Sequence, residues 1–162
     1  MLRTTNKPDD SFVGQQLAKH AFGIFGTPDI LARHPQNTPL SELPWIAWGN
    51  GLSDPWFEKF LPNARIAMRV NTGYGVERAI RSGIGVGHLA CYGAARDSDF
   101  LCLQALDRSL DLGLWLLAHR SVRRNKKVLV FMAFLGEKIR QDKDLIEGRL
   151  GSPLQGLDIP MF

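Results

Sequence analysis

Polar residues with hydrogen-bond donors gather at one point of the sequence, where a strand pattern gives way to a helix pattern. Asn71 and Thr72 follow an alternating apolar run and precede Gly73. A helix that begins here leaves its first backbone N–H groups free, and with the amide and hydroxyl they suit a carboxylate or phosphate. The alternative is that Asn71 or Thr72 only caps its own helix, as both residue types often do. The sequence leaves both interpretations open.

A strand, a helix and a second strand are predicted around these groups, over residues 65–89. Apolar residues alternate with others over residues 65–70, which predicts a strand with one buried face. The residues of that face are Ile66, Met68 and Val70. Residues 76–80 then carry apolar side chains at helical spacing, and Gly83 stands where the helix would stop. Residues 84–89 return to a buried extended pattern, so the stretch is a predicted βαβ unit.

The βαβ order places the polar groups where α/β proteins bind ligands. A helical crossover joins parallel strands and is right-handed, so the helix begins at the carboxyl end of the first strand. In open α/β sheets, ligands bind at that edge. The sequence therefore predicts an α/β fold, in which Asn71, Thr72 and Gly73 form a candidate anion-binding mouth or only the start of the helix.

No catalytic, cofactor or metal site is predicted. Neither a GxSxG elbow nor a P-loop occurs, and the glycines after the helix stand in the reverse order of a dinucleotide fingerprint. These glycines are Gly83, Gly85 and Gly87. The histidines lack metal-ligand spacing; they are His20, His34, His88 and His119. The sequence favours a binding protein over an enzyme, because no nucleophile, base and oxyanion donor can be assembled from it.

Composition indicates a globular chain of 162 residues with a formal charge of +4. Residues 120–127 carry a basic cluster that either attracts an anionic partner, such as nucleic acid, or is the solvated start of a helix. Cys91 and Cys102 form no CxxC pair, and no signal peptide or membrane span is recognisable. A reducing cytoplasm and no membrane partner are expected.

Further elements are predicted on both sides of the βαβ unit. Aromatic residues in the second of the predicted helices, Trp56, Phe57 and Phe60, are expected in the core. Another helix begins near Asn125, and its buried stripe is Val128, Met132, Leu135 and Ile139, with Phe131 beside it. The other predicted strands are 20–25, 45–48, 100–103 and 112–119, and the other predicted helices are 28–32 and one starting near residue 54.

Several stretches of the sequence, taken in order, resemble segments of one protein family. The stretch RVNTGYGVERAIRSGIGVGHLA resembles the segment of LysR-type transcriptional regulators in which a strand ending in a polar pair leads into a helix and a glycine-rich turn. The segments FGIFGTPDILARHPQ and LPWIAWG resemble strands of the second subdomain of that family. The longer segment LGLWLLAHRSVRRNKKVLVFMAFLGEKI resembles the strand and helix by which the chain returns to the first subdomain. The resemblance covers residues 2–141.

This resemblance implies an α/β effector-binding domain of two lobes, similar to type II periplasmic binding proteins, with a small-molecule cleft between them. Carried over by position, the effector contacts are Asn71, Thr72 and Gly73, with Thr27 a further candidate. Donors at a helix N-terminus favour an anionic effector. The expected parts are a partial first lobe, a complete second lobe, a return to the first lobe and a tail. Their bounds are 1–25, 26–111, 112–147 and 148–162.

Regulators of this family also carry an N-terminal winged helix-turn-helix and the opening strands of the first lobe, which this sequence does not show before Met1. We therefore expect DNA contact only through that missing domain, and a sensing role within an intact regulator. The alternative is a stand-alone interaction protein that modulates an intact regulator by hetero-oligomerisation. Missing strands leave sheet edges open, so self-association is also expected.

Overall fold

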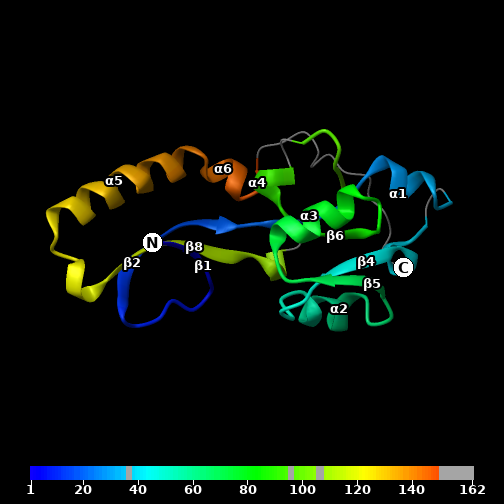
Figure 1. Cartoon of the computed structure of the whole chain (residues 1–162), viewed down its shortest axis with the longest axis horizontal. Helices are drawn as coiled ribbons and strands as arrows, with labels where there is room; N and C mark the ends of the chain where they lie inside the picture. Colours follow the sequence, from blue (N-terminus) through cyan, green and yellow to red (C-terminus); the bar gives the residue numbers. More distant parts are fainter. Residues whose placement is uncertain (36–37, 95–96, 105–107, 150–162) are drawn as a thin grey trace.

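The computed structural model describes residues 1–35, 38–94, 97–104 and 108–149. Two sheets lie end to end along the long axis of the molecule, and each carries its own helices (Figure 1). Within the described residues, no helix is both long and apolar enough to cross a membrane. Most of the expected tail falls outside the described residues, and the expected lobe bounds stay a prediction.

The smaller sheet joins segments that lie far apart in the sequence. Its order is β1-β8-β2, and both strand pairs are antiparallel. The strands are β1 (Leu2–Thr4), β2 (Phe12–His20) and β8 (Leu112–His119). The helices α5 (Lys126–Gln141) and α6 (Lys143–Ile146) contact this sheet.

The larger sheet has five strands in the order β5-β4-β6-β3-β7. The pairs of β4 with β5 and with β6 are parallel, and those of β3 with β6 and with β7 are antiparallel. The strands are β3 (Phe22–Gly26), β4 (Pro44–Trp48), β5 (Arg65–Val70), β6 (Val86–Ala90) and β7 (Leu101–Gln104). The helices of this lobe are α1 (Pro28–Ala32), α2 (Asp54–Phe60), α3 (Gly73–Arg81) and α4 (Cys91–Ala94). Single 3-10 turns occupy Leu40–Glu42, Arg108–Leu110 and Arg120–Val122.

The predicted βαβ unit is confirmed as β5, α3 and β6. Thr72 is the N-cap of α3, and its hydroxyl accepts a hydrogen bond from the Gly75 N–H at 3.1 Å. Gly83 ends the helix with a φ of 67°, a left-handed conformation that favours glycine. Both strands lie parallel to β4, which runs between them.

The prediction of one buried face on β5 is wrong. The register of β5 against β4 shifts between Ile66 and Met68, so Ile66 and Val70 pack into different core clusters. Met68 is 41% exposed, because β5 is the outermost strand of the sheet. A bulge inserts one extra residue, so the side chains after it point to the face opposite to the one that alternation predicts, and period-two counting cannot foresee this.

Two apolar clusters cover the two faces of the five-stranded sheet. Neighbouring residues on β4 alternate between them, since Ile46 joins the cluster under α3 and Trp45 joins the other. Trp45 packs against Trp56 and Phe57 with ring centroids 5.6 and 5.1 Å away. Its indole N–H donates to the Leu40 carbonyl at 2.8 Å. The prediction that the α2 aromatics belong to the core is confirmed for Trp56 and Phe57, and Phe60 packs at its edge.

Helix α5 begins after Asn125, as predicted, and the Asn125 side chain accepts from the Lys127 N–H at 3.0 Å. The predicted stripe is half-buried against the small sheet. Phe131, however, is 58% exposed rather than packed beside that stripe. The sheet that α5 covers has only three strands, so part of the apolar surface of the helix finds no cover among the described residues.

We expect Gly83→Ala to lower the free energy of unfolding by about 1–2 kcal/mol, the typical cost of holding an alanine in the left-handed region. Gly93→Ala is the matched control, because a Cβ there meets nothing within 4 Å and Gly93 lies in α4. Urea unfolding of the two variants measures the difference. Equal losses would contradict the assignment of Gly83 as a conformational stop.

Candidate functional site

A cleft of about 490 Å³ lies between the two lobes. Its volume is within the range of small-molecule sites, and both sheets contribute to its walls. From the small sheet come Thr4, His20 and Leu112. From the larger lobe come Phe22, Trp48, Asn50, Leu52, Gly73, Tyr74, Glu77, Leu89, Ala90, Tyr92, Gly93 and Ala94. A molecule bound here would touch both lobes at once.

The N-terminus of α3 opens into this cleft. Gly73 and Tyr74 begin the helix and line the cleft, and the first N–H groups of a helix have no intrahelical acceptor. The positive end of the helix dipole therefore faces the cavity. One turn further, the Glu77 carboxylate also reaches the wall, and it accepts from Arg81 at 3.2 Å. Arg81 also pairs with Asp97 and Asp99, so it offsets only part of the negative charge that Glu77 brings to the cleft.

Of the predicted site residues, Gly73 lines the cleft. Thr72 and Asn71 are exposed at its rim, next to Gly73 in the chain, and the Thr72 hydroxyl accepts from its own helix. Thr27 does not line this cleft. It is 6% exposed at the end of β3, and its hydroxyl has no partner among the described residues. The structure therefore brings three of the four predicted residues to one mouth and leaves Thr27 elsewhere.

Sequence reasoning missed His20 and Tyr92, which form the wall where the lobes meet. The His20 ring stacks on Phe22 with centroids 5.0 Å apart and meets the Tyr92 ring edge-on at 5.4 Å. Burial lowers the His20 pKa below its ordinary value of 6.5, despite the nearby Asp111. No sequence signal marked this wall, because the sequence predicts one strand over residues 20–25, whereas in the structure β2 ends at His20 and β3 begins at Phe22.

A second hollow of about 370 Å³ continues from the cleft along the small sheet. Thr4, His20 and Tyr92 line both spaces. Arg3 is a further basic residue among those that line the second hollow. The two spaces together offer donors from both lobes.

Neither metal nor thiol chemistry is supported by this site. No group of three or more His, Cys, Asp or Glu side chains that could hold a metal ion occurs in the part of the chain described. Burial raises the pKa of the Cys91 thiol to about 12, and burial also raises that of Cys102. Both thiols are buried and protonated at neutral pH, which is the opposite of a reactive cysteine.

Residues 1–140 match the family model of the LysR substrate binding domain, so the chain belongs to that family. The effector domain of the transcriptional regulator AmpR of Pseudomonas aeruginosa has a similar structure, with 16% identity, a TM-score of 0.68, and 88% of this chain covering 71% of that one. The regulatory domain of CrgA from Neisseria meningitidis is 17% identical with a TM-score of 0.66, over 85% of this chain and 73% of that one. The CcmR regulatory domain of Synechocystis PCC6803 in complex with 2-PG is 13% identical with a TM-score of 0.61, over 85% and 72%. No curated protein sequence is significantly similar to this chain.

These similarities confirm the resemblance and the two-lobed fold class expected from the sequence. At such low identity the solved structures show the fold alone, and the family model shows the family. Family and fold are those of effector-binding domains of transcriptional regulators and not of enzymes. Full-length AphB of Vibrio cholerae is also similar in structure, with 16% identity and a TM-score of 0.58 over 83% of this chain, and the chain spans 50% of it.

The lowered pKa of His20 predicts a pH dependence of stability. The unfolded chain takes up the proton near pH 6.5 and the folded chain only at lower pH, so the His20 contribution is complete above pH 6.5 and decreases as the pH falls below it. We expect the free energy of unfolding to fall between pH 7 and pH 5. His20→Gln should flatten that dependence, whereas Thr38→Ser, a control on the other lobe that removes no titratable group, should leave it unchanged. Urea unfolding at a series of pH values measures both; identical slopes in all three proteins would contradict the assignment.

Proposed function

We propose that this chain binds a small organic anion in the cleft between its lobes, as the sensing part of a LysR-type transcriptional regulator. The observation that carries this proposal is the cleft itself, which both lobes line and into which the first turn of α3 opens. Membership of the LysR substrate-binding family supports it. This role belongs in the cytoplasm, where transcription is controlled.

The chemistry of the cleft favours an anion with an apolar body. Backbone N–H groups of Gly73 and Tyr74 are the donors, and the Thr72 hydroxyl and Asn71 amide lie beside them at the rim. Aromatic side chains form much of the remaining wall; they are Phe22, Trp48, Tyr74 and Tyr92. The CcmR regulatory domain in complex with 2-PG is a precedent for a small ligand in this fold. The proposed effector is therefore a small carboxylate or phosphate ester.

Binding in such a cleft would bias the arrangement of the lobes. An effector that contacts α3 in one lobe and Thr4 or His20 in the other has more contacts when the lobes are close. The equilibrium then shifts by the difference in affinity between the two arrangements. In an intact regulator, the lobes would pass this shift to a DNA-binding domain outside the matched residues.

A second candidate is a stand-alone protein that modulates an intact regulator by forming hetero-oligomers. The exposed apolar side chains of α5 favour it, because they offer a surface for another polypeptide. The two functions are distinguished by what the isolated chain binds. The isolated chain should bind a small anion in the first case, and should bind only an intact LysR-type regulator in the second.

A charge placed at the helix mouth tests the anion proposal. Thr72→Asp retains an N-cap side chain and suits the positive end of α3, so stability should be unchanged or higher. Its carboxylate should repel an anion and weaken binding about tenfold or more, since two like charges about 4 Å apart near a protein surface repel each other by roughly a few kcal/mol. Thr72→Ser keeps the hydroxyl and is the matched control.

The measurement is a thermal-shift screen of phosphate and small carboxylates, followed by calorimetric titration of the best binder against all three proteins. The wild type and Thr72→Ser should bind equally well. Failure of every anion to raise the melting temperature would contradict the proposal. Equal affinity of Thr72→Asp would show that the anion does not bind at α3.

A further inference from the structure

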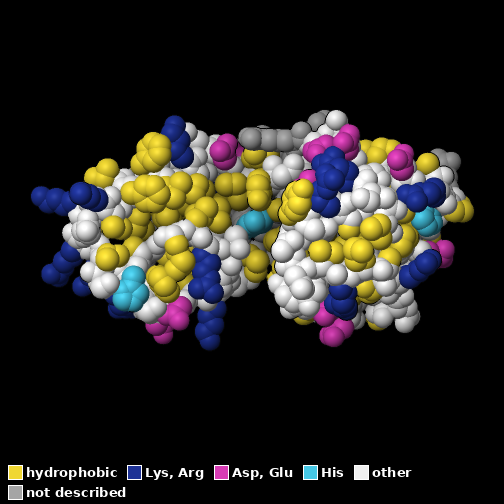
Figure 2. All heavy atoms as spheres, viewed as in Figure 1, with side chains coloured by type: hydrophobic (Ala, Val, Ile, Leu, Met, Phe, Trp, Pro, Cys, Tyr) yellow, Lys and Arg dark blue, Asp and Glu magenta, His cyan; other side chains and the backbone are white. Residues whose placement is uncertain are grey.

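Among the described residues, no side chain that lines the cleft carries a permanent positive charge, because none of them is lysine or arginine. Glu77 is the one carboxylate in this set, and His20 is the one member whose side chain becomes a cation when it takes up a proton. Figure 2 shows a histidine side chain at the surface where the two lobes meet, with hydrophobic side chains on both sides of it. The positive charge of the cleft therefore depends on the protonation of His20.

His20 stands on the other lobe from the donors of α3. It is the last residue of β2 in the small sheet, whereas Gly73 and Tyr74 begin α3, and all three line the same space. The helix N-terminus offers backbone donors for one negative group. A second negative group on the same ligand would meet the small-sheet wall, which consists of Thr4, His20 and Leu112. Of these three side chains, only that of His20 can supply a positive charge.

The contacts of His20 keep its ring neutral at pH 7 in the free chain. The ring stacks on Phe22 and meets Tyr92 edge-on, and its Nε2 atom is buried without a hydrogen-bond partner among the described residues. Burial lowers the pKa of His20 below its ordinary value, whereas the charge of Asp111 raises it. A further negative charge beside the ring would favour its protonated form.

Asp111 is the carboxylate best placed to stabilise a protonated His20. It is buried directly before β8, one of its oxygens accepts from Arg108 at 3.2 Å, and the other has no partner among the described residues. The other charged side chains on the elements around the ring are Arg3, Lys19, Glu77 and Glu147. Each of these two glutamates already pairs with an arginine, at 3.2 Å for Glu77 and at 2.8 Å for Glu147.

We propose that His20 makes the cleft selective for a small dicarboxylate, by taking up a proton from solvent when the ligand binds. This inference rests on the proposed function and adds the ligand class and a pH control of the same site. One carboxylate lies at the N-terminus of α3, and the second lies against the imidazolium of His20 on the other lobe. A monocarboxylate gains only the first of these interactions.

The sign of the pH dependence follows from this coupling. The free chain holds His20 neutral at pH 7 and the complex holds it protonated, so binding takes up as much as one proton. Affinity for a dicarboxylate should fall by up to about tenfold per pH unit between the His20 pKa of the free chain and that of the complex. Stability of the free chain and affinity for the ligand thus change with pH in opposite directions.

Isothermal titration calorimetry in buffers of different ionisation enthalpy counts the protons taken up on binding. The probes are linear dicarboxylates from malonate to adipate, each compared with the monocarboxylate of equal carbon number at pH 6.5 and above, where carboxylates are ionised. The best dicarboxylate should bind about tenfold or more tightly than its monocarboxylate, as a second close charge pair predicts. It should also take up a proton, whereas the monocarboxylate should not.

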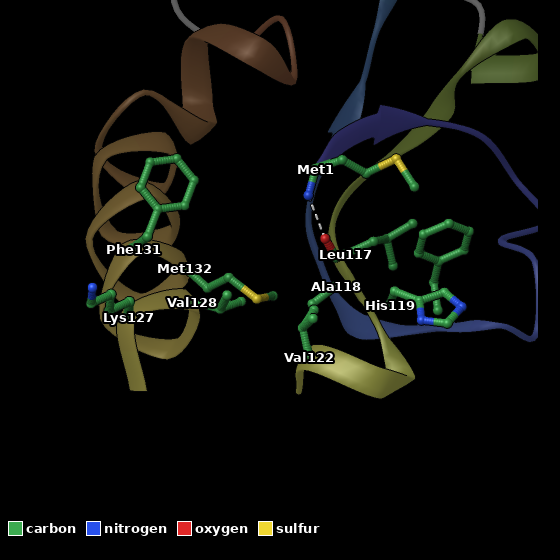
Figure 3. Close-up of a pocket in the computed structure, with 10 residues that line it drawn as sticks. Met1, Leu117, Ala118, His119, Val122, Lys127, Val128, Phe131 and Met132 are labelled. Carbon is green, nitrogen blue, oxygen red and sulfur yellow. Dashed lines mark hydrogen bonds between the residues drawn. The ribbon is translucent and has the colours of Figure 1, made fainter. Parts of the chain in front are cut away.

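Two histidine variants locate the proton. His20→Gln should abolish the proton uptake and the preference for the dicarboxylate, and should leave the affinity for the monocarboxylate unchanged. His119→Gln is the matched control, because His119 belongs to the same sheet but lines the hollow between β8 and α5 rather than the cleft (Figure 3). This control should take up the proton and bind both probes as the wild type does.

Asp111→Asn tests the supporting carboxylate without a ligand. Loss of its charge should lower the pKa of His20 further, which an NMR titration of the imidazole protons measures. The same variant should take up less than the wild-type number of protons at high pH, because the complex then holds the proton less firmly. An unchanged His20 titration would overturn the part assigned to Asp111.

The outcomes separate this inference from the proposed function. Dicarboxylate binding without proton uptake, or with an uptake that survives in His20→Gln, would overturn the inference alone. Failure of every dicarboxylate to bind would also overturn it. In that case the proposed function stands if inorganic phosphate or a monocarboxylate raises the melting temperature, and both fall if no anion does.

Discussion

The central position of β4 between two parallel partners is the constraint on which the cleft depends. Pairing of β4 with β5 and β6 forces α3 to cross over β4 and to begin at the carboxyl edge of the sheet. The same edge holds Trp48, the last residue of β4, whose indole N–H donates to the His88 carbonyl of β6 at 3.3 Å. Gly85 makes this pairing possible, because a Cβ at that position would clash with the Pro44 carbonyl. Gly85 therefore serves strand packing and not phosphate binding.

The lobes are joined through Ala21, which links three segments that are distant in sequence. Its carbonyl accepts from the Cys91 N–H of α4 at 2.9 Å, and its N–H donates to the Ile146 carbonyl of α6 at 3.2 Å. Ala21 itself is fully buried. His20 and Tyr92, at the inner wall of the cleft, are each one residue away from this junction. An occupant of the cleft thus touches residues next to one of the junctions between the lobes.

Local chemistry was enough to predict most elements, because their signals lie within a few residues. Thr72 as a cap, Gly83 as a stop and Asn125 as the start of α5 are examples. Features that depend on distant partners were not predictable. The bulge in β5 arises from its register against β4, and the His20 wall of the cleft is completed by Tyr92 of α4. Capping of α3 by Thr72 depends on neighbouring residues and was predictable, whereas ligand binding by Thr72 depends on a molecule outside the chain and stays a proposal.

The small sheet has consequences for how the chain is made. Each of its strand pairs includes β8, and Leu2 lies opposite Leu116 while Phe12 lies opposite His119. A ribosome therefore releases β1 and β2 long before their common partner exists, whereas every strand of the larger sheet emerges between them and β8. Such non-local pairing is slow to form and leaves strand edges open in the meantime. We therefore expect the larger lobe to fold first and the small sheet to form only once β8 has been made.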